Sequence, residues 1–259
     1  HPELAERFLA DYRRRSGDDW PSSLAWHYMA YRAHVRAKVA CLRHARGDPS
    51  AAAAARSLHG AALRHLESAR LRMVVVGGTP GTGKTTLSRA LADALGASRF
   101  SSDEVRDDLF PPDVRPSGRA GGGGGPEEIS AGRYAPEAVD AVYAELLGRA
   151  GTSLGLGEHV VLDASWLDRR HRSAARELAE GTGATLVELR CTCPPPVAEA
   201  RIEQRARAGT DASEATVEVA RALTNSADPW PQATEIETDA TIGAAVATAL
   251  THIDARIRS

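Results

Sequence analysis

An eight-residue segment, Gly78-Thr79-Pro80-Gly81-Thr82-Gly83-Lys84-Thr85, constrains the fold of this chain more than any other stretch. It satisfies the pattern G-x-x-x-x-G-K-[ST] and directly follows the apolar run Met73–Val76. Glycines at this spacing let consecutive backbone N–H groups turn inward around an anion, and the next helix, expected to start near Gly83, points its positive end at that anion. The segment therefore predicts a phosphate-binding loop (P-loop) between a strand and a helix.

The polar residues of the P-loop have expected roles in binding ATP and Mg²⁺. Lys84 would reach the β- and γ-phosphates, and the Thr85 hydroxyl would ligate Mg²⁺. An amphipathic segment, 86–95, follows immediately and provides the expected helix. The residues expected to bind the nucleotide are Gly78, Thr79, Pro80, Gly81, Thr82, Gly83, Lys84, Thr85 and Thr86.

The composition is that of an ordinary globular protein. The 259 residues are 42% apolar and 25% charged, which suits one large domain or two smaller ones. The formal net charge of −2 argues against a polynucleotide partner, although a local basic groove stays compatible with it. No apolar run approaches the roughly 18 residues of a membrane span, and no segment resembles a signal peptide. We therefore expect a cytoplasmic protein with no membrane partner.

Neither the cysteines nor the histidines are spaced as in a metal site. The three cysteines are Cys41, Cys191 and Cys193, and the last two alternate within an apparent strand, so their side chains should face the same side. We interpret them as small core or surface residues in a reducing compartment. The nine histidines are scattered, and none is assigned as a ligand.

Three helices are expected before the first strand, over 2–15, 22–46 and 50–68. The chain opens at His1 in mid-helix, which suggests a fragment or a processed product. The second helix has an apolar stripe that we predict to be core: Leu24, Tyr28, Tyr31, Val35, Val39 and Leu42. The basic residues opposite the stripe are expected to face solvent or, alternatively, to meet another domain: Arg32, Arg36, Lys38 and Arg43.

From residue 71 onward, short apolar strands alternate with amphipathic helices. Strands are expected near 73–76, 97–102, 157–163, 185–191 and 234–238. The alternation predicts an α/β fold with a parallel sheet in a three-layer arrangement, in which a ligand binds at the carboxyl ends of the strands. We therefore divide the chain into a small all-helical N-terminal segment, 1–70, and an α/β domain, 71–259.

A glycine-rich segment, 118–125, contains five consecutive glycines and interrupts regular structure. Such a segment buries little and is expected to be flexible. Two interpretations stay open for it: a tether, or a mobile loop that covers the substrate.

Asp103 and Arg106 follow the second expected strand and, three residues apart, share one helix face. Asp103 could accept the proton of a substrate hydroxyl, while Arg106 could hold the substrate. A structural interpretation of Asp103 competes with this one, because an aspartate after Ser102 is also a favoured helix N-cap. The two roles are compatible.

Two further elements are placed where phosphoryl transfer would need them. Asp163 ends the apolar strand and is the candidate for holding Mg²⁺ through a water beside Thr85. Arg201 and Arg205 share a helix face, with Arg207 nearby, before a break in regular structure. They are expected to form a lid over the transferring phosphoryl group, or else a solvated basic face.

These motifs together resemble the small P-loop kinases grouped with gluconate kinase, chloramphenicol phosphotransferase, zeta toxin and the kinase domain of polynucleotide kinase. The resemblance covers about residues 71–259 and implies a P-loop NTPase fold of the nucleoside-monophosphate-kinase type. It implies ATP-dependent transfer of the γ-phosphoryl group to a hydroxyl, with Asp103 as the base and Arg106 on the substrate. Lys84 and the lid arginines Arg201 and Arg205 would then act on the phosphates.

The first 45 or so residues are similar to the C-terminal helices of aminoglycoside-phosphotransferase-like domains. Such domains sit upstream of a P-loop kinase domain in some bacterial two-part proteins. The similarity is carried by the stretch Ala-Tyr-Arg-Ala-His-Val-Arg-Ala-Lys-Val-Ala, residues 30–40. It implies that residues 1–70 are the tail of a covalently linked upstream domain that is absent from this chain.

Three functions are therefore considered. The first is a kinase for a hydroxyl of a small molecule such as a sugar, an aminosugar or an antibiotic-like compound. A polynucleotide 5′-hydroxyl kinase is the nearest variant, and a regulatory ATPase module without an acceptor is the alternative from another class. Large AAA-type machines are disfavoured, because we find no convincing sensor region or oligomer-facing arginine after the core.

Overall fold

The computed structural model describes residues 2–17, 20–111, 132–208 and 216–258. The described residues form two compact units. One contains the residues up to 70 together with 156–158, and the other contains residues 71–155 and 159–258. We call them the helical unit and the sheet unit and describe each by itself. The glycine-rich segment 118–125 lies outside the described residues, so its two interpretations stay predictions.

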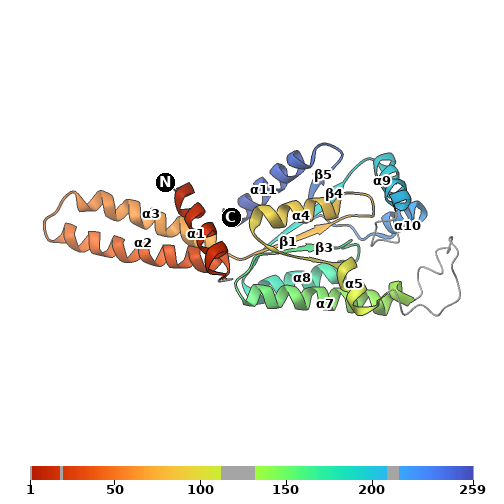
Figure 1. Cartoon of the computed structure of the whole chain (residues 1–259), viewed down its shortest axis with the longest axis horizontal. Helices are drawn as coiled ribbons and strands as arrows, with labels where there is room; N and C mark the ends of the chain where they lie inside the picture. Colours follow the sequence, from red (N-terminus) through yellow and green to blue (C-terminus); the bar gives the residue numbers. More distant parts are fainter. Residues whose placement is uncertain (1, 18–19, 112–131, 209–215, 259) are drawn as a thin grey trace. The chain divides into compact units, whose positions relative to one another are not determined.

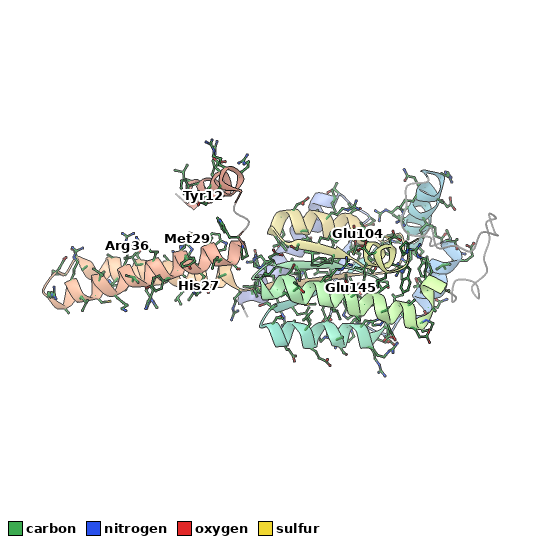
Figure 2. The ribbon with its side chains drawn as sticks, turned by 60° about the horizontal axis from the view of Figure 1, so that its bottom comes forward. Tyr12, His27, Met29, Arg36, Glu104 and Glu145 are labelled. Carbon is green, nitrogen blue, oxygen red and sulfur yellow. The ribbon has the colours of Figure 1, made fainter. Side chains whose placement is uncertain are left out.

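The helical unit contains the three expected helices, α1 (Pro2–Ser16), α2 (Ser22–Ala45) and α3 (Ala51–Ala69) (Figure 1). Pro21, with a φ of −66°, is the residue that precedes α2, a position where the fixed φ of proline suits the entry to a helix. Helices α2 and α3 pack against each other. Arg36, predicted to be solvated, is exposed on α2 (Figure 2).

The prediction that the large apolar stripe of α2 is core is wrong. Tyr28 and Tyr31 are each 61% exposed, and Leu42 is 60% exposed. The buried residues of α2 are alanines that recur at helical spacing: Ala30, Ala33, Ala37 and Ala40. Alanine loses no side-chain rotamer freedom on burial, and the distance between packed helices depends on the side chains at their contact. The helices therefore pack through their small residues, and the larger apolar residues face outward.

The sheet unit is built on five parallel strands in the order β2-β3-β1-β4-β5. The strands are β1 (Arg72–Gly77), β2 (Ser98–Ser101), β3 (Val160–Asp163), β4 (Thr185–Thr192) and β5 (Thr234–Glu237). In the register, Asp163 lies opposite Val76 of β1 on one side and Ser101 of β2 on the other. The carboxyl ends of the three strands that carry the predicted site residues therefore meet at one edge.

Helices cover both faces of this sheet, as Figure 1 shows with α4 and α11 on one side and α7 and α8 on the other. The helices of the sheet unit are α4 (Lys84–Leu95), α5 (Ser102–Leu109), α7 (Pro136–Gly155), α8 (Arg169–Thr182), α9 (Pro195–Ala208), α10 (Val217–Ser226) and α11 (Ile242–Arg258), with a short 3₁₀ turn at Gly132–Tyr134. The predicted three-layer α/β fold with a parallel sheet is confirmed.

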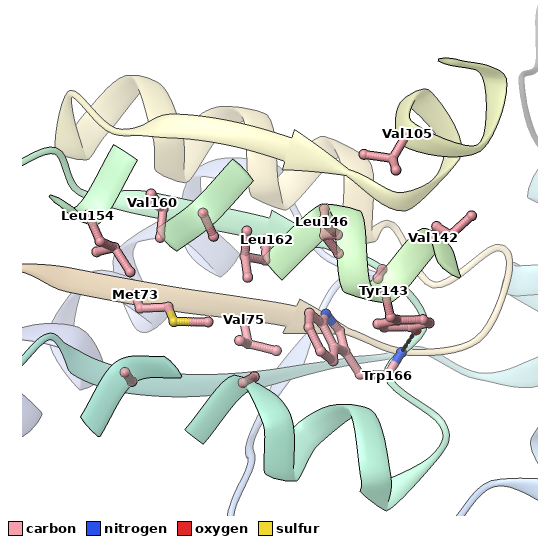
Figure 3. Close-up of a cluster of buried hydrophobic side chains, with 14 of the residues drawn as sticks. Met73, Val75, Val105, Val142, Tyr143, Leu146, Leu154, Val160, Leu162 and Trp166 are labelled. Atoms are coloured by element: carbon pink, nitrogen blue, oxygen red, sulfur yellow. Dashed lines mark hydrogen bonds between the residues drawn. The ribbon is translucent and has the colours of Figure 1, made fainter. Parts of the chain in front are cut away.

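Alternation along the strands divides the core into two layers. Met73, Val75 and Leu162 pack with residues of α7 and α8 (Figure 3), whereas Val74 and Val76 pack with residues of α4 and α11. Successive side chains of a strand point to opposite faces, so a strand covered on both faces is apolar throughout. This explains the continuous apolar run before the P-loop. None of the described helices is both long enough and apolar enough to cross a membrane.

Candidate active site

The P-loop joins β1 to α4 and can be formed only with glycine at several positions. Gly78 and Gly81 have φ values of 135° and 84°, a region that residues with a Cβ rarely enter. A Cβ on Gly78 would lie 2.7 Å from the Cys191 carbonyl oxygen, and one on Gly81 would lie 2.5 Å from that of Ala198. Gly83, also left-handed, is the N-cap of α4. The loop is thus enclosed by the ends of β4 and α9.

Lys84 begins α4, and its side chain lies inside the P-loop. Its Nζ donates a hydrogen bond to the Thr79 carbonyl oxygen at 3.0 Å. Burial lowers the pKa of Lys84, while the negative charges of Asp163 and Asp103 oppose that shift. An ammonium group that is costly to bury gains most from an anion placed beside it, so the loop is suited to bind phosphate.

Asp163 is 3% exposed at the end of β3 and is held by two neighbours. Its Oδ2 accepts hydrogen bonds from Ser88 Oγ at 3.0 Å and from an Arg99 guanidinium nitrogen at 3.2 Å. Ser88 lies one turn after Lys84 on α4. The second carboxylate oxygen, Oδ1, remains as an acceptor, so Asp163 suits a hydrated Mg²⁺ near Thr85, where one carboxylate and one hydroxyl are the usual protein ligands.

Asp103 does not cap helix α5. The N-cap is Ser101, whose Oγ accepts a hydrogen bond from the Asp103 backbone N–H at 3.3 Å. The structural interpretation of Asp103 as an N-cap is therefore wrong, because the N-cap lies two residues earlier and Asp103 is already inside the helix. The Asp103 carboxylate instead accepts a hydrogen bond from Arg106 at 2.6 Å, with Arg106 only 8% exposed. The Arg106 guanidinium lies 4.8 Å from the centre of the Tyr134 ring, a distance suited to a cation–π contact.

The loop after β3 contributes residues that the sequence analysis did not identify. The Ser165 carbonyl accepts a hydrogen bond from the Gly78 N–H at 3.1 Å and so braces the start of the P-loop. Trp166 has a φ of 54° and is fully buried, and its N–H donates to the Tyr143 hydroxyl at 2.9 Å (Figure 3). Backbone strain of this kind persists where surrounding contacts enforce it and often marks a functional site.

A buried arginine fixes that loop. Arg172, 3% exposed, donates to the carbonyl oxygens of Trp166, Leu167 and Pro229 at 2.7 to 2.9 Å. These contacts join the loop after β3 to the segment before β5. No sequence pattern marks this arrangement, because its partners are backbone atoms as many as 57 residues away.

The arginines of α9 differ in their surroundings. Arg201 donates to the carbonyl oxygens of Thr238 at 2.6 Å and of Gly81 at 3.4 Å, which ties α9 to the P-loop. The positive charge of Arg205 acts on Lys84 and contributes to lowering the Lys84 pKa. Arg207 is 78% exposed in its side chain and pairs with Glu203. Arg201 and Arg205 are thus near the P-loop, and Arg207 belongs to the solvated surface.

The two cysteines near β4 lie beside the P-loop. Cys191 is buried behind Gly78, and burial raises its pKa to about 12. Cys193 Sγ lies 4.0 Å from the Gly81 carbonyl oxygen. In the part of the chain that the structure describes, no group of three or more His, Cys, Asp or Glu side chains could by itself hold a metal ion.

The structure brings most of the predicted site residues to one edge of the sheet. The charges of Asp163, Asp103 and Arg205 all act on Lys84, and Arg106 is paired with Asp103. A P-loop between the first strand and helix of a parallel sheet, with an acidic residue ending the neighbouring strand, defines a P-loop NTPase with the kinase fold.

The chain belongs to the AAA domain family, whose sequence pattern matches residues 73–230. The match runs from β1 to the segment before β5 and so covers most of the sheet unit.

Relatives of known sequence are found in mycobacteria. Uncharacterized protein Rv2004c of Mycobacterium tuberculosis and uncharacterized protein Mb2027c of Mycobacterium bovis are each 42% identical over 236 residues. The match covers 91% of this chain and 45% of each relative, so the chain spans about half the length of these relatives.

Two solved structures with the same fold are described as kinases. A gluconokinase from Sinorhizobium meliloti 1021 has a TM-score of 0.54 at 18% identity, over 73% of this chain and 95% of its own. A putative kinase from Chloroflexus aurantiacus has a TM-score of 0.52 at 22% identity, over 71% of this chain and 97% of its own. At such identities the likeness shows a common fold.

Proposed function

We propose that residues 71–259 form an ATP-dependent kinase that transfers the γ-phosphoryl group to a hydroxyl of a small molecule. The observation that carries the proposal is the placement of the Asp103 carboxylate. It is not used to cap α5, it is held by Arg106, and it lies close enough to the P-loop lysine for the two charges to interact. Transfer to an acceptor hydroxyl needs a carboxylate beside the phosphate site, whereas nucleotide binding alone does not.

The residues have separable roles in this reaction. The P-loop N–H groups of residues 78–86 and Lys84 bind the phosphates. Thr85 and Asp163 would hold Mg²⁺, which supplies charge neutralisation between the β- and γ-phosphates. Asp103 accepts the proton of the acceptor hydroxyl, whose oxygen forms the new bond to phosphorus as the bond to the ADP oxygen breaks. Arg106 orients the acceptor, and Arg205 stabilises charge on the transferring group.

The acceptor class of the proposal is a sugar, an aminosugar or an antibiotic-like compound. The net charge of −2 supports a small molecule over a polynucleotide. The gluconokinase that shares the fold acts, by its name, on a small polyhydroxy acid. A cytoplasmic location, where ATP is abundant, is part of the same proposal.

A second candidate function is a regulatory ATPase module that hydrolyses ATP without an acceptor. The description of the family as an AAA domain favours it.

For the remaining part of the chain, we propose that residues 1–70 are the tail of a covalently linked phosphotransferase-like domain. The greater length of the mycobacterial relatives is compatible with such a longer protein.

The experiment that tests the kinase is ATP consumption by the purified chain, with and without a panel of sugars, aminosugars, antibiotics and 5′-hydroxyl oligonucleotides. Stimulation by one class that is lost in Asp103→Ala supports an acceptor kinase and names its substrate. Asp108→Ala is the matched control, because Asp108 lies on the same helix, is 59% exposed and pairs with Arg149 at the surface. Slow, acceptor-independent hydrolysis that is equal in both variants and the wild type would favour the ATPase module.

A further inference from the structure

Arg99 of β2 is a largely buried arginine that the reaction as described does not use. Its side chain is 12% exposed. In the sheet register Arg99 lies opposite Val161, two residues before Asp163. Val161 packs in the core layer that contains α4, and strand side chains two residues apart share a face. Arg99 and Asp163 are therefore side by side on the face that α4 covers.

The three nitrogens of this guanidinium contact three different elements. Nε donates to Ser88 Oγ of α4 at 3.2 Å, one terminal nitrogen donates to Asp163 of β3 at 3.2 Å, and the other donates to Glu104 of α5 at 2.8 Å. Glu104, labelled in Figure 2, is adjacent to Asp103 in sequence. Arg99 thus links the P-loop helix, the end of β3 and the helix of the proposed base.

The contacts of Arg99 fix the orientation of the Asp163 carboxylate. A carboxylate that is 3% exposed needs a charge partner, because an unpaired buried charge is strongly destabilising. Both Arg99 and Ser88 contact Oδ2, and none of these contacts uses Oδ1. The planar guanidinium fork fixes an acceptor more rigidly than a single ammonium does. Oδ1 is therefore held in a constant orientation.

A second cation competes for the same carboxylate. Lys84 is partly buried, and the negative charge of Asp163 acts on it. If Asp163 lost Arg99, an ion pair with Lys84, whose charge already interacts with it, would compensate the buried carboxylate. That pair would withdraw the lysine from the phosphates and the aspartate from the metal at the same time.

We propose that Arg99 is a positioning residue that holds Asp163 by Oδ2 and so keeps it out of an ion pair with Lys84. Oδ1 is then the oxygen that would accept a hydrogen bond from a hydrated Mg²⁺, and the Lys84 ammonium stays available to phosphate. This inference rests on the nucleotide site of the proposed function, but it does not depend on which acceptor is used or on whether there is one.

The test is ATP binding by the full chain, measured by calorimetry in EDTA and again in Mg²⁺, for variants at Arg99 and Asp163. Arg99→Met should weaken metal-free ATP binding by about tenfold, since a charge-assisted hydrogen bond to phosphate is withdrawn. Asp163→Asn alone should leave metal-free binding within about twofold and lose the gain that Mg²⁺ provides. The double variant should recover the metal-free affinity of the wild type, because an amide no longer attracts Lys84.

Recovery of the metal-free ATP affinity in the double variant separates a positioning role from a merely structural one, because the effects of two residues in contact cancel in ATP binding only if Arg99 acts through Asp163. Arg99→Lys keeps a positive charge beside Asp163 and should retain metal-free binding within about threefold, which tests the idea even if Arg99→Met folds poorly. Arg89→Met is the control, because Arg89 is an exposed arginine of α4.

Failure of the proposed role of Arg99 and failure of the proposed nucleotide site would give different results. If the wild type binds ATP and Arg99→Met binds it equally well in EDTA, or if the double variant is weaker than either single one, the role of Arg99 is overturned and the kinase proposal stands. If the wild type binds no ATP in either condition, the nucleotide site itself is overturned and the role of Arg99 falls with it.

Discussion

The Asp103 carboxylate and the Arg106 guanidinium lie 2.6 Å apart, one turn along α5, and the arginine is buried whereas the aspartate is partly exposed. The pair orients the carboxylate without removing it from solvent, because the Asp103 side chain keeps 37% of its exposure. A base that must meet an incoming hydroxyl requires this combination of fixed direction and access.

Arg106→Lys should weaken the acceptor step and leave nucleotide binding intact. Lysine keeps the positive charge but loses the planar fork and the contact with the Tyr134 ring. We expect the KM of the acceptor to rise by about tenfold, which corresponds to roughly 1.4 kcal/mol, with the affinity for Mg·ATP unchanged. Steady-state kinetics in both substrates check this. A matching rise in the KM for ATP would contradict the placement of Arg106 on the acceptor side.

Lys84→Ala should abolish stabilisation of the protein by nucleotide. Mg·ATP at 100 times its Kd is expected to stabilise the wild type by about 2.7 kcal/mol through mass action, seen as a rise in the thermal midpoint. The natural control is Lys38→Ala, since Lys38 is the only other lysine of the chain and lies exposed on α2. A thermal shift that persists in Lys84→Ala would mean that residues 78–85 do not bind the phosphates.

Arg201→Ala and Arg205→Ala should have different kinetic effects, although the two arginines share a helix face. Arg201 already donates to the backbone at Gly81 and Thr238, so its loss loosens the P-loop and raises the KM for ATP. Arg205 acts on Lys84, so its loss should lower turnover by about tenfold or more, as for a group that stabilises transferring charge. The exposed Arg207→Ala is the control. Identical effects of the first two substitutions would refute this division of roles.

His159 should make the sheet unit sensitive to acid. It is 3% exposed, and its Nδ1 accepts a hydrogen bond from the Arg72 N–H at 3.3 Å, as a neutral imidazole can. Burial, with a smaller contribution from the Arg72 charge, lowers the pKa of His159 from 6.5 to about 4. Between these values the unfolded chain binds the proton and the folded one does not, so stability is lost as the pH falls from about 6.5 to about 4.

The loss of stability attributable to His159 should reach about 3 kcal/mol at the acid end of that window. His159→Gln keeps an acceptor and cannot gain the proton, so its unfolding free energy should vary less with pH. Chemical unfolding at a series of pH values measures both curves. His252→Gln, at an exposed position of α11, should retain the slope of the wild type; equal slopes for all three proteins would rule out His159 as the cause.

The packing of α2 on α3 makes a further prediction in the helical unit. Ala37 is 6% exposed, whereas Val39, two residues further on, is 52% exposed. Ala37→Leu should destabilise the unit by about 1 to 3 kcal/mol through overpacking, and Val39→Ser should change its stability by no more than about 0.5 kcal/mol. Far-UV circular dichroism during urea unfolding measures the stability of both variants. A larger loss of stability for Val39→Ser than for Ala37→Leu would mean that the large apolar residues of α2 are core after all.

The sheet unit could be predicted from sequence because its signals are local. The P-loop pattern, the apolar strands and the amphipathic helices each occupy a few consecutive residues, and parallel strands place their carboxyl ends together without further information. The order β2-β3-β1-β4-β5 then brings Asp163 between the P-loop and Ser101. Asp103, Arg106 and Asp163 were identified for that reason.

What the sequence did not reveal depends on contacts between distant residues. Arg99 and Asp163 are 64 residues apart, and nothing near either one marks the pair. The positive φ of Trp166 follows from its burial and from the Tyr143 hydroxyl, which no local pattern encodes. In α2 the larger apolar residues dominated the periodicity, yet the alanines between them, which bury with no loss of rotamer freedom, form the contact.

The two tryptophans at Gly77 give the protein a built-in optical probe. A Cβ on Gly77 would lie 2.4 Å from the ring of Trp230 and 3.2 Å from the Cβ of Trp166, so both tryptophans lie against the residue that precedes the P-loop. The other two of the four tryptophans, Trp20 and Trp26, belong to the helical unit. Because indole emission follows its surroundings, ordering of the loop around a nucleotide should change the intrinsic fluorescence without any attached label. Trp166→Phe and Trp230→Phe would assign that signal to one ring or the other.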